Sequence, residues 1–199
     1  MLVHEIMTSP AYSVPMGASL EAAMRMMATA RVSSLPVVDD GGCVVGIISE
    51  ADVLGEGLEP DPRAHMRPVS PQSRPLPATV AEVMTARPYT VREDNDVADL
   101  ALVFARTGWK SVPVTRGEAL LGVVSRSDLI RAMARPDIEI AVEIATAFGE
   151  IGLKGWHAEV FAGVAHITGT ASERERAAAT SIVQSVRGIR RVTVQEADA

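Results

Sequence analysis

The stretch Gly46-Ile47-Ile48-Ser49-Glu50-Ala51-Asp52 decides the fold, because it occurs twice in the chain. The second copy is Gly122-Val123-Val124-Ser125-Arg126-Ser127-Asp128. In each copy a glycine opens a short apolar run, which predicts a buried strand. A serine follows, and an aspartate stands three residues later at the start of another apolar-periodic segment. The pattern therefore predicts a strand-to-helix turn that carries a hydroxyl and a carboxylate close together.

This turn has two interpretations, which the residues alone leave open. A serine three residues before an acid, ahead of an apolar run, is a capping box that satisfies the first N–H groups of a helix. In the functional interpretation the aspartate accepts hydrogen bonds from a ribose diol and the serine assists. A hydrogen bond to a charged acceptor contributes roughly 1.5–3 kcal/mol net. The two interpretations are compatible.

The duplication extends well beyond this stretch. Glu5-Ile6-Met7-Thr8 returns as Glu82-Val83-Met84-Thr85, and Ser34-Leu35-Pro36-Val37 returns as Ser111-Val112-Pro113-Val114, both at an offset of 77. The Gly-x-x-Ser-x-x-Asp stretch returns at 76, so one residue is missing from the preceding turn, where loops absorb deletions. Each copy predicts strand, helix, strand, strand and helix. Because about fifty residues bury too little surface to be stable alone, we expect the two copies to pack sheet to sheet about a pseudo-two-fold axis.

Helix signals frame each copy. Ser19 and Asp96 are the expected N-caps of amphipathic helices, and turns at residues 39–42 and 116–118 join the paired strands. Residues 58–78 hold half of the chain's 12 prolines, which excludes a continuous helix and predicts an extended connector between the copies.

The pattern changes after Pro136. Asp137 is the expected cap of a helix that ends at Gly149, and residues 159–170 predict two strands around a tight turn. Ser172 and Glu175 form a capping box for a further helix, and residues 190–194 alternate as a last strand. The fold class is therefore mixed α/β: two β-α-β-β-α units followed by a small α-β-β-α-β domain.

Composition and charge argue against nucleic-acid binding and against a secreted or membrane-spanning protein. Apolar residues are 47% of the chain and charged residues 22%, and the net charge of −6 gives no basic footprint for nucleic acid. The single Cys43 fits a reducing compartment, the first residues do not resemble a signal peptide, and no apolar run is long enough to span a membrane. We expect a cytoplasmic protein.

The repeated motifs resemble the CBS domain, the regulatory unit named after cystathionine β-synthase. The resemblance rests on Glu-Ile-Met-Thr, Val-Ser-Ser-Leu-Pro-Val-Val-Asp and Gly-Ile-Ile-Ser-Glu-Ala-Asp, each in order and most of them twice. It implies one CBS unit at residues 1–57, a connector at 58–78 and a second unit at 79–135. It also implies a homodimer.

The C-terminal residues 137–196 resemble a BON domain in their element order and in glycines before Val164 and after Thr168. This resemblance implies attachment to phospholipid or to a small ligand. A small α+β domain that makes only protein contacts is the alternative.

The CBS resemblance implies two adenosine sites in the cleft between the paired units. Carried over by position, the first comprises Ser125, Ser127, Asp128, Lys110, Arg126, Thr8, Tyr12, Val32 and Ser33. The second comprises Ser49, Asp52, Thr85, Tyr89 and Trp109.

The two sites differ in their phosphate-binding positions. The first has Lys110 and Arg126, whereas the second has Ser33 and Glu50 at the matching positions. Because basic residues make the strong charge-assisted bonds to phosphate, we expect a phosphorylated nucleotide to prefer the Asp128 site. The Asp52 site is then empty or holds an uncharged adenosyl group. An ordinary exposed lysine is the alternative for Lys110.

Nothing in the sequence supports catalysis or a metal site. The histidines His4, His65, His157 and His166 are scattered, and the chain has no P-loop and no dinucleotide-binding fingerprint. We therefore expect a regulatory protein without enzymatic activity that senses an AMP- or ATP-like ligand. It would pass the change to a partner or membrane through the C-terminal domain. The alternative is an interaction protein in which the CBS pair only dimerises and the C-terminal domain docks to protein or phospholipid.

Overall fold

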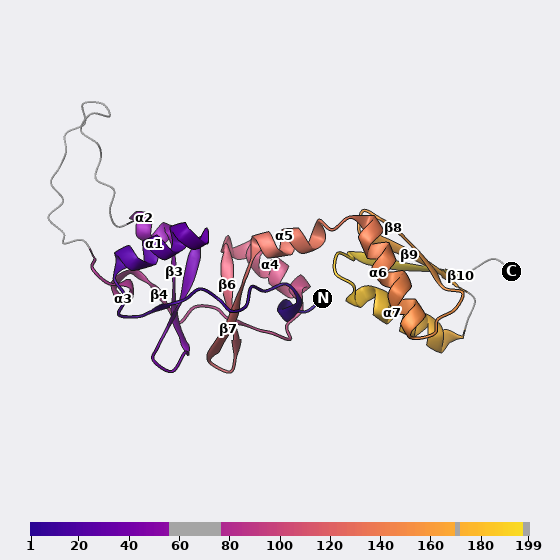
Figure 1. Cartoon of the computed structure of the whole chain (residues 1–199), viewed down its shortest axis with the longest axis horizontal. Coiled ribbons are helices and arrows are strands. Elements are labelled where there is room, and N and C mark those ends of the chain that lie inside the picture. The colour runs from indigo at the N-terminus through magenta and orange to yellow at the C-terminus, as the bar shows by residue number, and fades with distance from the viewer. Residues whose placement is uncertain (56–76, 170–171, 197–199) are drawn as a thin grey trace, which may run out of the picture. The chain divides into compact units, whose positions relative to one another are not determined.

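Figure 1 shows the computed structural model, which describes residues 1–55, 77–169 and 172–196. Its internal contacts divide the chain into two compact units. One unit, here called the sheet unit, comprises residues 7–95 and 104–125. The other, the C-terminal unit, comprises residues 1–6, 96–103 and 126–199. The mixed α/β class predicted from the sequence is confirmed.

The sheet unit contains two sheets, one from each copy of the repeat. The first has the strand order β1-β2-β3-β4, with strands β1 (Val14–Pro15), β2 (Ser34–Val38), β3 (Val44–Ser49) and β4 (Thr85–Ala86). The helices of this part are α1 (Leu20–Ala30), α2 (Glu50–Gly55) and α3 (Val80–Val83). Strand β1 pairs in parallel with β2, and the other pairs are antiparallel. Ala23 and Met27 of α1 pack with Leu35, Val37 and Ile48 of the sheet into one buried cluster.

The second sheet repeats this plan with the order β5-β6-β7. Its strands are β5 (Val91–Arg92), β6 (Ser111–Arg116) and β7 (Ala119–Ser125). Helix α4 (Val97–Thr107) stands between β5 and β6 in the sequence, and α5 (Arg126–Met133) follows β7. The register shifts between Val37 and Val38 in the first hairpin and between Val114 and Thr115 in the second. The two copies therefore share even this irregularity at matching positions.

Reciprocal contacts join the two sheets, as a pseudo-two-fold relation requires. Val44 N–H donates to Glu118 O at 3.0 Å, and Leu120 N–H donates to Gly42 O at 3.1 Å. The buried hydroxyls of Ser34 and Ser111 hydrogen-bond to each other, and these two residues occupy the same position in the two copies. The expected sheet-to-sheet packing of the copies is thus present.

Each copy also lends its leading segment to the other copy's sheet. Thr85 of β4 pairs with Ile47 of β3, and Thr8 pairs with Val123 of β7. The repeated glycine permits this crossing: a Cβ on Gly46 would lie 2.5 Å from Met84 Sδ, and one on Gly122 would lie 2.7 Å from Thr8 O. In each case the Met-Thr motif of one copy therefore packs against the glycine of the other copy.

The predicted caps of the first helices are confirmed. Ser19 Oγ accepts from Ala22 N–H at 3.2 Å, and Asp96 Oδ1 accepts from Ala98 N–H at 2.9 Å. The first residues of α1 and α4 were predictable from local sequence, because a cap residue hydrogen-bonds to the first turn of the helix that follows it.

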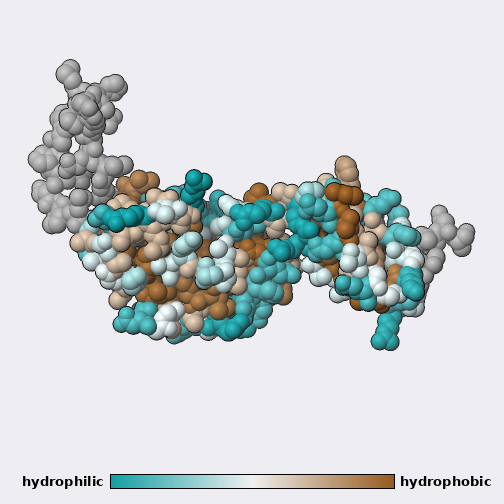
Figure 2. Space-filling view, viewed as in Figure 1, coloured by the Kyte–Doolittle hydropathy of each residue, from teal (hydrophilic) through white to brown (hydrophobic). Residues whose placement is uncertain are grey.

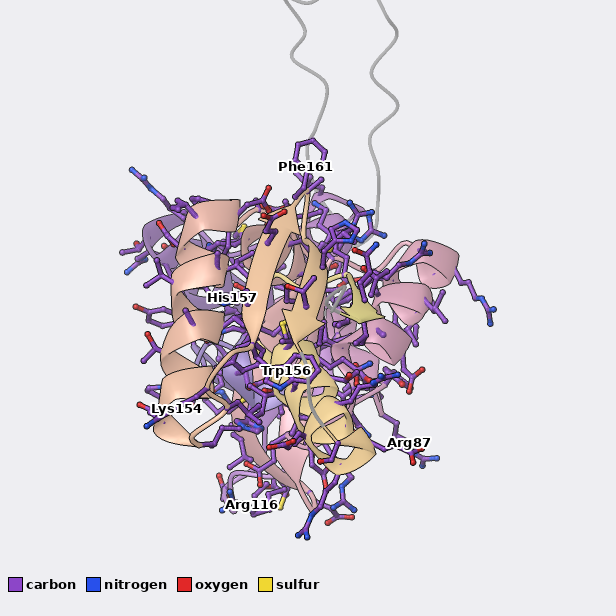
Figure 3. All side chains as sticks on the ribbon, turned by 90° about the vertical axis from the view of Figure 1, so that its right-hand side faces the viewer. Arg87, Arg116, Lys154, Trp156, His157 and Phe161 are labelled. Carbon is purple, nitrogen blue, oxygen red and sulfur yellow. The ribbon has the colours of Figure 1, made fainter. Side chains whose placement is uncertain are left out.

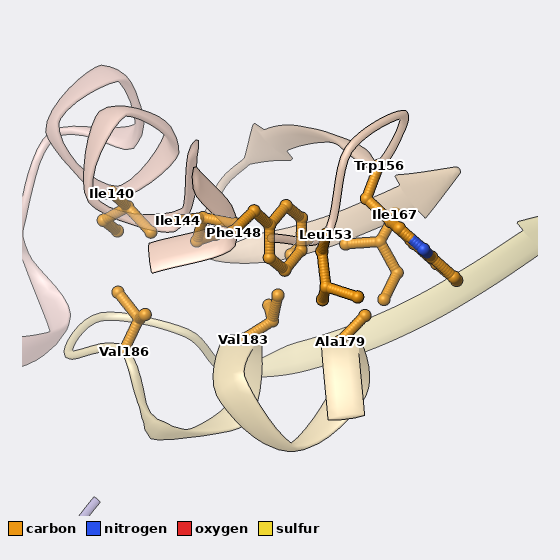
Figure 4. Packing of buried hydrophobic residues seen from close by; sticks show 10 residues of the cluster. Ile140, Ile144, Phe148, Leu153, Trp156, Ile167, Ala179, Val183 and Val186 are labelled. Carbon is orange, nitrogen blue, oxygen red and sulfur yellow. The ribbon is translucent and has the colours of Figure 1, made fainter. Parts of the chain in front are cut away.

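The C-terminal unit has the predicted element order after α5. Its elements are α6 (Asp137–Glu150), β8 (His157–Phe161), β9 (Val164–Gly169), α7 (Glu173–Ser185) and β10 (Arg191–Glu196), and a short 3₁₀ helix, η1 (Val3–Glu5), also belongs to this unit. The sheet order is β10-β9-β8, parallel between β10 and β9 and antiparallel between β9 and β8. Figure 4 shows Phe148 of α6 above Val183 of α7, with Ile167 of the sheet to one side beside Trp156. Ser172 and Glu175 form the predicted capping box.

Asp137 differs from its prediction. It is the first residue of α6 rather than the cap, and its carboxylate instead accepts from Ala162 N–H at 2.7 Å and Gly163 N–H at 2.9 Å. The tertiary contact with the β8–β9 turn takes the oxygens that a cap would use. Figure 3 shows Phe161 at this turn, pointing away from the strands.

The surface of the C-terminal unit includes exposed apolar side chains. Figure 2 shows hydrophobic surface over α6, where Ile138 and Val142 are exposed. None of the helices in the described ranges combines the length and apolar character needed to cross a membrane. Most of the proline-rich connector, with His65, lies outside the described residues.

Candidate functional site

A pocket of about 360 Å³ lies within the sheet unit and is lined by both copies of the repeat. This volume is at the lower end of the range for small-molecule sites. The first copy supplies Ser33, Ser34, Ile47, Ser49, Glu50, Ala51 and Asp52. The second supplies Thr85, Pro88, Tyr89, Gly108, Trp109, Lys110, Ser111 and Val112.

Asp52 lies in the first turn of α2, at one wall of the pocket. Its Oδ2 accepts from both the backbone N–H and the hydroxyl of Ser49, each at 2.7 Å. The acid of the predicted capping box therefore does reach back to the residue that precedes its helix, while the serine hydroxyl donates to that acid. Among the described residues, the other carboxylate oxygen, Oδ1, has no hydrogen-bond partner. The half-buried Asp52 thus keeps one acceptor beyond its structural role.

An exposed aromatic pair forms another part of the lining. The rings of Tyr89 and Trp109 are tilted by 33° with centroids 5.6 Å apart. Tyr89 is 47% exposed and Trp109 is 44% exposed. Exposed flat rings beside a pocket are suited to stacking on a planar base.

Thr85 reaches the pocket because α3 and β4 carry the leading segment of the second copy across β3. A capping box starts α3: Glu82 Oε1 accepts from Thr79 N–H at 3.1 Å and from the Thr79 hydroxyl at 2.6 Å. The Thr79 hydroxyl bond, above all, lowers the pKa of the Glu82 carboxyl below its ordinary value. Local capping thereby fixes the segment that delivers Thr85.

Lys110 and Ser33 are grouped differently from the sequence assignment, which put them with Asp128. Both line the pocket that contains Asp52, and Lys110 Nζ lies 2.8 Å from Glu50 Oε2. The reason is the Ser34–Ser111 hydrogen bond, which holds the starts of β2 and β6 together, so that the residues just before both strands face one pocket. That the Asp128 site prefers a phosphorylated nucleotide stays a prediction.

The five residues assigned to the second site all line this pocket. They are Ser49, Asp52, Thr85, Tyr89 and Trp109. Their role in holding a ligand stays a prediction.

The residues assigned with Asp128 are divided between the two compact units. Thr8, Tyr12, Val32, Ser33 and Ser125 belong to the sheet unit, and Arg126, Ser127 and Asp128 belong to the C-terminal unit. Within the latter, the buried Asp128 accepts a bond at 3.0 Å from Arg131 Nη1. An Asp128 site stays a prediction.

Sequence reasoning missed several lining residues. Pro88 and Gly108 have no side-chain group that indicates ligand binding, and Ser34 and Ser111 were assigned only to an apolar strand motif. The sequence identified Glu50 as the counterpart of Arg126. It did not predict the ion pair of Glu50 with Lys110, because the two residues are 60 positions apart. Within the described ranges, no group of three or more His, Cys, Asp or Glu side chains is placed to hold a metal ion.

Comparison with known proteins identifies the repeat. The family model described as the CBS domain matches residues 3–59 and 80–135. An uncharacterised protein of Methanocaldococcus jannaschii, MJ1404, is 30% identical over 133 residues, which make up 66% of this chain and 32% of that protein. The chain thus spans about a third of the length of this relative.

Solved structures show the same fold over the repeat. The CBS domain pair of protein MJ0100, in complex with 5′-methylthioadenosine and S-adenosyl-L-methionine, has a TM-score of 0.53 at 25% identity. It covers 66% of this chain, and 94% of that chain is covered. CBSX2 in complex with AMP has a TM-score of 0.53 at 23% identity, with the same two coverages of 66% and 94%.

Proposed function

Because this chain belongs to the CBS domain family, with a model match that spans both copies of its repeat, we propose that it is a regulatory protein without catalytic activity that binds an adenosyl ligand. The binding site is the Asp52 pocket of the sheet unit. The observation that carries this proposal is the set of five residues expected from the sequence, all of which line one pocket of about 360 Å³.

The chemistry of the lining supports an adenosine moiety. Asp52 Oδ1 is an acceptor for a ribose hydroxyl, while Oδ2 remains held by Ser49. Tyr89 and Trp109 offer ring faces for the adenine base, and base–aromatic stacking contributes roughly 1–3 kcal/mol in comparable sites. The MJ0100 domain pair binds two adenosyl compounds, which agrees with this class of ligand.

The test is a titration of the full chain with adenosine, AMP, ATP, 5′-methylthioadenosine and S-adenosylmethionine by calorimetry. We expect at least one of them to bind, and Asp52→Ala to lower its affinity about tenfold or more, since the substitution removes a bond to a charged acceptor. Absence of binding by every ligand at millimolar concentration would contradict the proposal.

A second adenosyl site at Asp128 belongs to the proposal as well. In this proposed site Asp128 has the role that Asp52 has in the first. A calorimetric stoichiometry of two ligands per chain, reduced to one by either Asp128→Ala or Asp52→Ala, is the expected result for two independent sites. Thermal unfolding of Asp128→Ala controls for loss of the buried Asp128–Arg131 pair.

Ligand binding would act by stabilising one arrangement of the two copies, or of two chains in a homodimer, over another. The C-terminal unit, with its BON-like element order, would pass this difference to a protein partner or to phospholipid. Analytical ultracentrifugation with and without ligand tests the dimer, and liposome flotation tests the lipid contact.

An interaction protein without ligand sensing is the second candidate. The observation in its favour is the pair of hydrogen bonds from Ser49 to Asp52, which gives Asp52 a structural reason to be present. This candidate would be favoured if the chain floats with liposomes and calorimetry detects no binding of any adenosyl ligand.

A further inference from the structure

The Asp52 pocket has an unequal balance of charged side chains. Its lining contains two carboxylates, from Glu50 and Asp52, and one ammonium group, from Lys110. A phosphomonoester carries about −1.5 to −2 charge at neutral pH. A phosphorylated ligand would therefore enter a pocket whose lining is already net negative.

Lys110 is not available to attract a phosphate without cost, because its ammonium group already pairs with a carboxylate. Its Nζ lies 2.8 Å from Glu50 Oε2, across the two copies of the repeat. For Lys110 to bind a phosphate it must leave Glu50, or the phosphate must lie beside the Glu50 carboxylate. In both cases the gain from the ammonium group is offset by a lost or a repulsive contact.

We infer that the Glu50–Lys110 ion pair makes this pocket select adenosyl ligands with an uncharged or cationic 5′ substituent, such as a thioether or sulfonium, over phosphorylated nucleotides. This inference rests on the proposed function and names its ligand class. It also reverses the outcome that Lys110 alone would give, since an unpaired lysine here would favour phosphate.

The pair is exposed, which limits its effect. The side chain of Lys110 is 66% exposed and that of Glu50 is 48% exposed. Exposed ion pairs contribute little and are screened by salt, so changing one partner alters affinity by about fivefold at most. The signature of the pair is therefore a change in selectivity between ligands rather than a loss of all binding.

The experiment compares AMP with 5′-methylthioadenosine by calorimetry on the wild-type chain and on Glu50→Gln. Asp52→Ala identifies which part of the binding belongs to this pocket. We expect the wild type to bind 5′-methylthioadenosine more tightly than AMP in the pocket. Glu50→Gln releases Lys110 and raises AMP affinity by about two- to fivefold, while the affinity for the thioether changes by less than about twofold. At about 0.5 M salt the gain for AMP shrinks.

Glu21→Gln is the matched control, because Glu21 forms an exposed ion pair with Arg25 on α1, outside the pocket. It should leave both affinities unchanged. Tighter binding of AMP than of the thioether by the wild-type pocket, or an equal effect of Glu50→Gln on both ligands, would overturn the inference and leave the proposed function standing. Failure of both ligands, and of every other adenosyl compound, to bind would remove the proposed function itself.

Discussion

At the scale of single residues, Asp52 shows how one carboxylate can hold its own helix end and keep an acceptor for a ligand. Oδ2 accepts two bonds from Ser49 at the start of α2, and Oδ1 has no hydrogen-bond partner among the described residues. A residue that is already held by its own helix end needs little further ordering when a ligand arrives. The two interpretations left open by the sequence are therefore compatible in this geometry, and the binding role stays a prediction.

The repeated glycines predict unequal effects of the same substitution. A Cβ at Gly122 meets the backbone oxygen of Thr8 at 2.7 Å, whereas one at Gly46 meets the flexible side chain of Met84 first. Because backbone cannot move aside as a methionine can, we expect Gly122→Ala to destabilise the chain by about 1–3 kcal/mol, and Gly46→Ala by less. Urea unfolding monitored by circular dichroism measures both, and equal losses would contradict this account.

Trp109 gives a test of the aromatic wall. Its side chain is 44% exposed, so Trp109→Ala should change the free energy of unfolding by no more than about 0.5 kcal/mol. If Trp109 stacks on a base, the same substitution weakens adenosyl binding by roughly 1–3 kcal/mol in calorimetry. Phe161→Ala is the control, because Phe161 is 79% exposed in the C-terminal unit and should leave affinity unchanged.

At the scale of elements, the parts that rest on neighbouring residues were predictable and the parts that rest on distant pairing were not. The starts of α1, α4 and α7 follow from Ser19, Asp96 and Ser172, each acting on its own first turn. Strand β4 has only two residues and exists because it pairs with β3. Asp137 was misassigned for the same reason, since the β8–β9 turn that binds its carboxylate lies 25 residues away.

The candidate site divides in the same way. The five residues assigned around Asp52 come from the resemblance to the CBS domain, carried over by position, and all five line the pocket. The placement of Lys110 depends on how the two sheets meet at Ser34 and Ser111, which no local pattern encodes.

The capping box of α3 predicts a pH-dependent contribution to stability. Since hydrogen bonds from Thr79 lower the folded-state pKa of Glu82, its contribution is fully present above the ordinary pKa of 4.5 and is lost as the pH falls through the lower folded value. Thr79→Ala should therefore lower the melting temperature by about 2–4 °C at pH 7 and by less at pH 3. Thermal melts of both proteins at the two pH values measure this difference; an equal difference at both would contradict it.

At the scale of the whole molecule, each compact unit has a tryptophan of its own. Trp109 lies in the sheet unit at the pocket, and Trp156 lies in the core of the C-terminal unit at 7% exposure. The two rings therefore report on different parts of the chain.

This separation predicts distinct fluorescence from two single-tryptophan variants. Trp156→Phe leaves only the exposed Trp109, whose emission acrylamide should quench several-fold more strongly than that of Trp156 in Trp109→Phe. Adenosyl ligand should change the emission of the first variant and leave that of the second unchanged. A ligand response from Trp156 alone would contradict the assignment of the pocket.

The hydroxyl pair of Ser34 and Ser111 bears on how such a chain arises. Each serine meets its own counterpart, which is the contact that a single unfused copy would make with a second copy of itself across a true symmetry axis. In such a symmetric dimer every substitution would occur in both halves at once. Within one chain the two copies can differ, and Ser33 and Lys110, each one residue before these serines, form an asymmetry that a symmetric assembly could not have.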